Sequence, residues 1–248
     1  MICFVYKLSA MVELATLLDI ARLFVGTTIL LYASYTDIKI RKASDMLWVI
    51  MGSVGAILLF VQYLTIEFDN IFYLIFIPIM IVLMYIFFQL RLIFGGADAK
   101  AMMALAILVP LEPSIFEFPI LTSFMPFSWV ILSNSVLLFL LIPMSLFIYN
   151  IGLRNIKFPY CLLGYKLSLE KAKERFVWPL EKIVDGKRKF SYIPMEFDVE
   201  DDLETFEKNG VMEIWVTPKI PFMIPLLIGF LCSFIFGDIL FYLMNLIL

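Results

Sequence analysis

Long apolar runs separated by short polar segments make up most of the chain. A helix needs about 20 apolar residues to cross the core of a bilayer. Six runs come near that length, at residues 15–36, 45–65, 71–93, 98–112, 129–151 and 220–247. The fourth is short because Pro110 and Pro113 interrupt the apolar sequence at its end, so it could extend toward residues 118–127 or be re-entrant. The pattern predicts a mainly α-helical, polytopic membrane protein with a bundle of six transmembrane helices.

The only long polar segment covers residues 152–219 and has its own pattern of elements. Residues 169–177 are typical of a helix with Ser168 as its N-cap, and residues 189–197 and 211–216 have the aromatic and β-branched content of strands. Asp185-Gly186 and Asn209-Gly210 are hairpin-type dipeptides, and the acidic run 198–204 is expected to be a solvated loop. This segment is predicted to form a small α+β domain.

The predicted organisation has three parts. Residues 1–151 form a membrane domain with the first five spans, residues 152–219 the soluble cytoplasmic α+β domain, and residues 220–248 the sixth span. Composition agrees, because 62% of the residues are hydrophobic and the mean hydropathy is +0.97, both above the usual values for soluble proteins. The main solvent of the chain is therefore expected to be lipid.

Basic residues predict the orientation of the spans. Lys39, Arg41 and Lys42 follow the first span, Arg91 and Lys100 flank the third loop, and 12 of the 19 Lys and Arg residues fall within 152–219. Residues 66–70 and 111–128 contain no Lys or Arg. Because cytoplasmic loops are enriched in Lys and Arg, the basic loops are predicted to face the cytoplasm from the cell membrane, and both termini to face outward.

Several kinds of chemistry are excluded by composition. The chain has no histidine, which removes Ser-His-Asp and Cys-His catalysis and every histidine-containing zinc or haem site. Its cysteines, Cys3, Cys161 and Cys232, have no C-x-x-C spacing. No metal or other cofactor is expected, and no charge pattern indicates a nucleic-acid partner.

Ionisable residues at membrane depth are costly and often functional. Those in or beside the predicted spans are Asp19, Arg22, Asp37, Asp98 and Asp238. Asp19 and Arg22 are three residues apart on one helix face, so a mutual ion pair is the favoured interpretation. Asp238 follows a glycine and is expected to pair with a neighbouring helix or cap a local break.

Asp37 and Asp98 form the more informative pair. Asp98 follows Gly95, Gly96 and Ala97 at the start of an apolar run, where an N-cap is the simpler alternative to catalysis. Asp37 falls at the C-terminal end of a span, where the helix dipole favours a cation instead. Asp37 ends an outside-to-inside span and Asp98 begins an inside-to-outside span, which predicts that the two lie at the same depth near the cytoplasm.

Paired carboxylates can hydrolyse a peptide bond without histidine. Two carboxyl groups in close contact tend to share one proton, which provides a base to activate water and an acid for the leaving group. Helix polarity favours Asp98 as base and Asp37 as acid, as a hypothesis. A transporter with a carboxylate relay and a non-enzymatic scaffold are the competing interpretations, although the spans show no evident internal repeat.

Two motifs carry a resemblance to known families. Gly95-Gly96-Ala97-Asp98 resembles the G-x-G-D-type motif of intramembrane aspartyl proteases, and Tyr35-Thr36-Asp37-Ile38-Lys39-Ile40-Arg41 resembles the first-aspartate segment of type IV prepilin peptidases. Nearly the whole chain is similar to the archaeal preflagellin peptidases, with six spans, a GGADAK-like segment and a soluble insertion before the last helix. Ala97 departs from the glycine of many members, and the cysteine-rich methyltransferase region of bacterial prepilin peptidases is missing.

The resemblance implies an aspartyl endopeptidase that removes a short basic leader from preflagellin-like precursors on the cytoplasmic side, for the archaeal flagellum. It places Asp37 and Asp98 in catalysis and Gly95, Gly96, Ala97, Lys39 and Arg41 beside them. Pro218 and Pro221 resemble a proline-containing segment that shapes the substrate cleft in presenilin-like relatives, with a helix-start proline as the simpler alternative. Independently, the acidic residues Asp198, Glu200, Asp201 and Asp202 are candidates for guiding a basic leader.

Overall fold

The chain divides into two compact units. The computed structural model describes residues 2–66, 71–90, 92–93, 95–175, 177–184, 186–191, 199–219 and 221–247. The first unit consists of residues 1–139 and 221–248, and the second of residues 140–220. The boundary falls within helix α5 (Phe127–Gly152), which contributes its first half to the first unit and its second half to the second.

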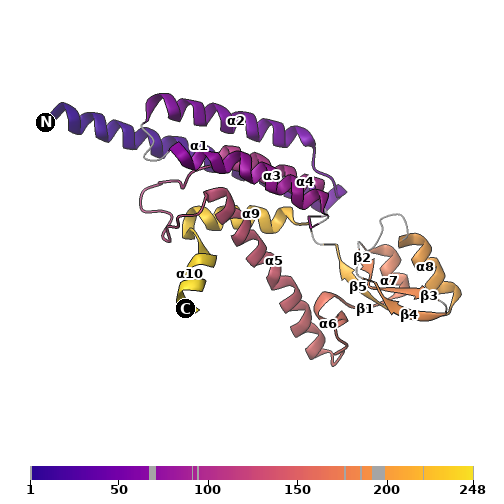
Figure 1. Ribbon diagram of the computed structural model, residues 1–248. Helices are drawn as coiled ribbons and strands as arrows, with labels where there is room; N and C mark the ends of the chain where they lie inside the picture. Colours follow the sequence, from indigo (N-terminus) through magenta and orange to yellow (C-terminus); the bar gives the residue numbers. More distant parts are fainter. Residues whose placement is uncertain are drawn as a thin grey trace. The chain divides into compact units, whose positions relative to one another are not determined.

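The first unit is helical. Its elements are α1 (Ile2–Ile40), α2 (Asp45–Thr65), η1 (Ile71–Ile75), α3 (Phe76–Gln89), α4 (Gly96–Leu108), the first half of α5, α9 (Met223–Phe236) and α10 (Ile239–Ile247). Helix α4 packs against both α2 and α3, and α1 packs against α2 and α9 (Figure 1). Alanines on α4, among them Ala101, Ala104 and Ala106, are buried and allow this close packing.

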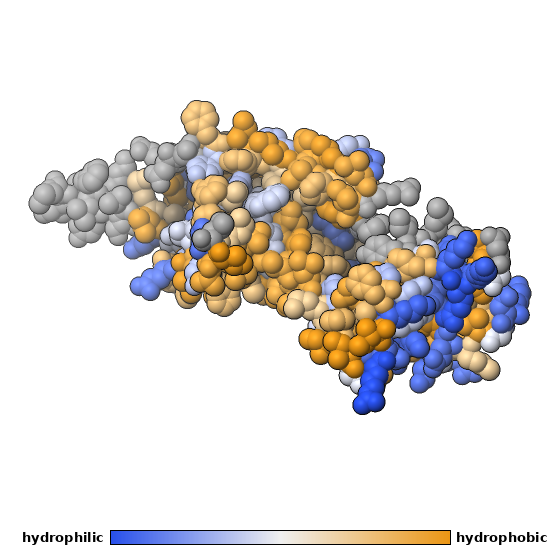
Figure 2. Space-filling model, turned by 60° about the horizontal axis from the view of Figure 1, so that its bottom comes forward, coloured by the Kyte–Doolittle hydropathy of each residue, from blue (hydrophilic) through white to orange (hydrophobic). Residues whose placement is uncertain are grey.

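Among the residues that the structure describes, four helices are long and apolar enough to cross a membrane. They cover Met11–Ile40, Asp45–Thr65, Phe72–Gln89 and Phe127–Gly152. Their outer faces expose large apolar side chains such as Phe24, Ile57 and Val82. In Figure 2, orange apolar residues cover most of the visible face of the helical unit, while blue polar residues gather over the second unit. The chain is therefore a multi-pass membrane protein.

The fourth and sixth apolar runs differ from the expected continuous spans. Helix α4 has 13 residues and ends before Pro110. The run 220–247 is broken between α9 and α10, so the prediction of one continuous helix there is wrong. Gly237 has a φ of 78°, and the carbonyl oxygen of Leu121 occupies the space that a side chain at Gly237 would need. The Leu121 backbone bonds to Phe236 O and Asp238 N, which replaces the helical bonds lost at the break.

The second unit has a small antiparallel sheet covered by helices, in agreement with the predicted α+β class. The sheet order is β1 (Tyr165–Ser168), β5 (Glu213–Pro218) and β2 (Val177–Pro179). A hairpin of β3 (Glu181–Val184) and β4 (Lys187–Phe190) stands beside it, with helices α6 (Tyr160–Leu163), α7 (Leu169–Glu174) and α8 (Val199–Lys208). Leu203 and Phe206 of α8 pack in one buried cluster with Ile214 and Val216 of β5.

Several predictions for this unit were wrong in detail. The acidic run 198–204 was expected as a loop, but residues 199–204 begin α8, because Leu203 and Phe206 give the segment an apolar face at helical spacing, and Asp198 lies outside the described residues. Gly210, with a φ of 68°, ends that helix rather than forming a hairpin. The predicted helix 169–177 ends at Glu174, and Val177 begins β2. Of the predicted strand 189–197, only the start falls in β4, and residues 192–197 lie outside the described residues.

Candidate active site

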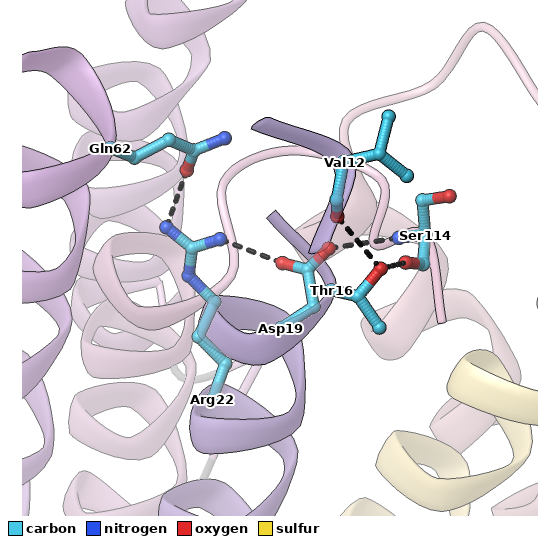
Figure 3. A network of polar contacts seen from close by, with 6 residues as sticks. All are labelled: Val12, Thr16, Asp19, Arg22, Gln62 and Ser114. Atoms are coloured by element: carbon cyan, nitrogen blue, oxygen red, sulfur yellow. Dashed lines mark hydrogen bonds and ion pairs between the residues drawn. The ribbon is translucent and has the colours of Figure 1, made fainter. Parts of the chain in front are cut away.

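Asp19 and Arg22 form the ion pair that their spacing predicts. Arg22 Nη1 lies 2.7 Å from Asp19 Oδ1, and both side chains are buried in the helical unit. Arg22 Nη2 also donates to Gln62 Oε1 at 2.6 Å, and Asp19 Oδ2 accepts from the backbone N–H of Ser114 at 2.9 Å (Figure 3). The pair therefore joins α1 to α2 and to the segment after α4, which is a structural role.

Asp238 also has a structural role, at the break in the sixth apolar run. Its Oδ1 accepts a hydrogen bond of 2.9 Å from the N–H of Phe241 in the first turn of α10, which confirms the expected cap. The side-chain amide of Asn134, from α5, donates to Ser233 Oγ at 2.9 Å and to Gly237 O at 2.8 Å. These bonds satisfy the buried backbone of the break.

Asp37 lies in the last turn of α1 and is half-buried. Its carbonyl oxygen accepts a bond of 3.1 Å from the N–H of Arg41, and the Arg41 side chain provides a positive charge close to the Asp37 carboxylate. Arg41 has a φ of 56°, and Ser44 then caps α2 by accepting from Met46 N. This sharp end of α1 keeps the carboxylate at the end of the helix, where the dipole opposes its charge.

Asp98 lies in the first turn of α4 and not at its N-cap, so the capping interpretation is wrong. The N-cap is Gly95, which provides no side-chain bond, and the N–H groups of Asp98 and Ala99 bond to the carbonyl oxygen of Gly95 at 3.1 and 3.2 Å. The Asp98 carboxyl group folds back over Gly95, so that any side chain there would collide with Oδ2. Gly96 is less restricted, since an added Cβ would approach only Phe88, at 3.4 Å.

Asp37 and Asp98 are distant in the sequence but are carried by two helices that pack together. Helices α1 and α4 are in contact, and the charge of the Asp37 carboxylate acts on the Asp98 carboxyl group. Asp98 is the more buried of the two. Two like-charged groups in a partly desolvated place favour a state in which they hold one proton between them.

An ion pair beside Asp98 was missed by the sequence reasoning. Lys100 Nζ lies 2.7 Å from both carboxylate oxygens of Asp45, which links the second turn of α4 to the first turn of α2. Both side chains are about half exposed or more. Their sequence positions indicate only two charged residues at helix starts, and nothing in the local pattern pairs them.

The remaining predicted site residues are spread over several elements. Lys39 is exposed, with its Nζ 5.8 Å from the ring centroid of Tyr35, and Ala97 is half-buried in the first turn of α4. Pro221 precedes α9, where its carbonyl accepts a bond from Ile224 N. Pro218 ends β5 in the second unit, opposite Val177. The roles of these four residues at a substrate cleft stay predictions.

The sequence matches two family models. Residues 24–144, which include Asp37 and Asp98, match the type IV leader peptidase family. Residues 156–239, which cover nearly all the polar segment and α9, match the archaeal peptidase A24 C-terminus, type II. The two models thus meet close to the boundary between the helical bundle and the α+β unit.

Curated relatives cover nearly the same length. The chain is 30% identical over 231 residues to a preflagellin peptidase of Methanocaldococcus jannaschii, with 86% of this chain and 93% of the relative aligned. It is 27% identical over 237 residues to a preflagellin peptidase of Methanococcus voltae, with coverages of 86% and 94%. A third, from Methanococcus maripaludis, is 29% identical over 234 residues at the same coverages. The chain therefore belongs to the type IV leader peptidase family and, within it, to the preflagellin peptidases.

Proposed function

We propose that this peptidase is a membrane-embedded aspartyl endopeptidase that removes the short basic leader of preflagellin-like precursors. Asp37 and Asp98 are its catalytic pair. The observation that supports the proposal is the packing of α1 against α4, which brings the charge of Asp37, at the end of α1, within electrostatic reach of Asp98, at the start of α4. Asp19 and Asp238, by comparison, have structural bonds that account for them.

The chemistry follows from one proton held between two carboxyl groups. The ionised carboxylate takes a proton from water, and the resulting hydroxide adds to the carbonyl carbon of the scissile peptide bond. The protonated carboxyl group then donates to the peptide nitrogen, the C–N bond breaks, and the products are a new carboxyl terminus and a new amine. The Gly95 backbone, without a side chain, leaves the Asp98 carboxyl group free to lie against it.

The proposed topology has six membrane-crossing segments in the cell membrane. Helices α1, α2, α3 and α5 are long enough by themselves. The fourth crossing is α4 with the segment after it, and the sixth is α9 with α10, joined through Gly237. Lys39, Arg41 and Lys42 then place the Asp37 end of α1 at the cytoplasm, where the basic leader of a precursor is expected.

Cleavage of a leader-bearing precursor in detergent tests the proposal. Asp37→Asn and Asp98→Asn should each lower the cleavage rate by about 10²-fold to 10⁴-fold, the usual contribution of general acid–base catalysis. Asp45→Asn is the matched control, because it removes an exposed carboxylate at the first residue of α2, just after the end of α1 that carries Asp37; it should keep most of the activity. Near-normal cleavage by either Asp37→Asn or Asp98→Asn would reject the pair.

The substrate class needs its own comparison. A precursor with its basic leader should be cut, whereas the same precursor with leader Lys and Arg residues changed to Gln should be cut more slowly. Equal rates for the two precursors would leave the peptidase chemistry in place but reject recognition of the basic leader.

A further inference from the structure

We propose that a cationic pocket in the second unit binds the phosphate of an anionic lipid headgroup. The pocket lies among β1, β3, β4, β5 and the segment before α6, and its volume is about 230 Å³. Its walls are formed by Lys157, Lys166, Glu181, Arg188, Glu213 and Trp215. The inference does not depend on the catalytic pair.

Two lysines give the pocket its available positive charge. Arg188 is neutralised by Glu181, which is 1% exposed, and it also donates to Glu213 O at 3.0 Å. Lys157 Nζ lies 4.5 Å from the ring centroid of Tyr160, and Lys166 Nζ 5.9 Å from that of Trp215.

An aromatic ring attracts an ammonium group but does not neutralise it. Lys157 and Lys166 therefore contribute two positive charges to the pocket, against the one carboxylate, Glu213, that is left after Glu181 pairs with Arg188. Phosphate oxygens are strong acceptors for ammonium donors. The charge balance thus favours an anion and disfavours a basic peptide.

Hydrogen bonds hold the pocket against the end of a membrane-spanning helix. Asn150, in the last turns of α5, is fully buried, and its side-chain amide donates to Cys161 O at 3.0 Å and to Gly164 O at 2.7 Å. The Tyr149 ring packs edge-on against Tyr165, the first residue of β1, with centroids 6.4 Å apart. The strand that carries Lys166 therefore begins at the end of α5.

The short stretch of chain between the end of α5 and Lys157 also places this lysine near the membrane surface. Lys157 follows the end of α5 at Gly152 by five residues, a path of at most about 17 Å even when fully extended. Arg154 has a φ of 55°, so the path turns and is shorter than that. Lys157 is thereby kept near the headgroup region that borders the hydrocarbon core.

Exposed apolar side chains beside the lysine distinguish a lipid from a soluble phosphate. Leu153, Ile156 and Phe158 are 53%, 66% and 76% exposed, and they alternate with Arg154 and Lys157. Apolar side chains interleaved with cations are typical of segments that lie at the bilayer surface, where the apolar groups enter the acyl boundary and the cations meet phosphates. These exposed apolar side chains would not contribute to the binding of a free anion.

The experiment is a lipid titration of the full-length protein in detergent, followed by native mass spectrometry. The ligands are short-chain phosphatidylglycerol, short-chain phosphatidylcholine and inorganic phosphate. Lys157→Gln/Lys166→Gln should weaken phosphatidylglycerol binding about tenfold. The control Lys171→Gln/Lys208→Gln removes the same charge from exposed lysines of the same unit and should leave binding unchanged.

The possible results separate the sources of the phosphate. Binding of phosphatidylglycerol that exceeds that of the other two ligands and depends on Lys157 and Lys166 supports the proposal. Equal loss in both double variants would mean general electrostatics and would overturn it, as would inorganic phosphate that binds as tightly as the lipid. The thermal unfolding midpoint of each variant shows that it is folded, and loss of cleavage activity alone would bear on the catalytic proposal only.

Discussion

The negative charge of Asp37, in the last turn of α1, acts on the carboxyl group of Asp98, in the first turn of α4. The two helix ends differ in how they accommodate a carboxylate, because the dipole at the end of α1 opposes the charge of Asp37 whereas the first turn of α4 favours the charge of Asp98. The position of Asp37 is therefore costly to the fold, and such costs at membrane depth are typical of functional sites.

Gly95 and Gly96 should differ sharply when each is changed to alanine. A Cβ at position 95 would collide with the Asp98 carboxyl group, whereas a Cβ at position 96 would make an ordinary contact with Phe88. We expect Gly95→Ala to lower precursor cleavage at least tenfold, because it displaces the reacting oxygen. Gly96→Ala should retain activity within about threefold. Cleavage rates in detergent measure both, and equal effects would contradict this account of the glycine pair.

Close packing of α2 on α4 is expected to depend on Gly55. A Cβ there would lie 2.6 Å from the Leu108 Cα, a backbone atom that has no freedom to move aside. Gly55→Ala should lower the free energy of unfolding by about 1–3 kcal/mol, as overpacking does.

Gly52, one turn earlier on α2, provides the control. A Cβ at position 52 would meet only the flexible Cδ1 of Ile107, at 3.7 Å, so Gly52→Ala should be close to neutral. Thermal unfolding in detergent measures both variants. A Gly52→Ala protein as unstable as Gly55→Ala would show that the Leu108 contact is not the cause.

The buried pair of Asp19 and Arg22 allows a test by paired substitution. Arg22→Leu leaves the Asp19 charge buried without its partner and should cost about 3–5 kcal/mol of stability. Asp19→Leu/Arg22→Leu removes both charges and should cost less than Arg22→Leu alone. Unfolding midpoints in one detergent compare the two proteins. A double variant less stable than the single would mean that the bond from Ser114 N to Asp19 outweighs the ion pair.

Much of this fold follows from the sequence, because lipid-spanning helices have strong compositional signals. The ion pair of Asp19 and Arg22 followed from helical spacing alone, and the cap at Asp238 was one of the two roles expected for that residue. The break at Gly237 did not, since it depends on Leu121, a residue from a distant loop. Helix α8 was taken for a loop because its charges outweigh two buried side chains, Leu203 and Phe206.

The candidate site, like the fold, could be predicted only in part from the sequence. Asp37 and Asp98 came from their charge at membrane depth and from topology. The link between Asp45 and Lys100 and the close approach of Asp98 to Gly95 required coordinates. The ion pair arises from the packing of α4 on α2, which no spacing within one helix encodes. The Gly95 contact is local, but it depends on the side-chain conformation of Asp98, which the sequence pattern does not specify.

The acidic residues around the start of α8 are expected to help recognise a basic leader. Asp201 is exposed, whereas Glu204 and Glu207 are paired with Lys208 and Lys173. Neutralising the predicted guide residues together, as Asp198→Asn/Glu200→Gln/Asp201→Asn/Asp202→Asn, should raise the apparent KM several-fold with little change in kcat, because long-range attraction acts on binding. The increase should shrink at high salt. A fall in kcat at unchanged KM would exclude a guiding role.

The most direct test of the catalytic pair compares the two single substitutions with their combination. If Asp37 and Asp98 share one proton and act as a unit, Asp37→Asn, Asp98→Asn and Asp37→Asn/Asp98→Asn should all reach the same low rate of precursor cleavage. As a control for folding, the thermal unfolding midpoint of each variant must lie within a few degrees of the midpoint of the unsubstituted protein. Losses that multiply in the double variant, or a single variant with near-normal cleavage, would contradict the account.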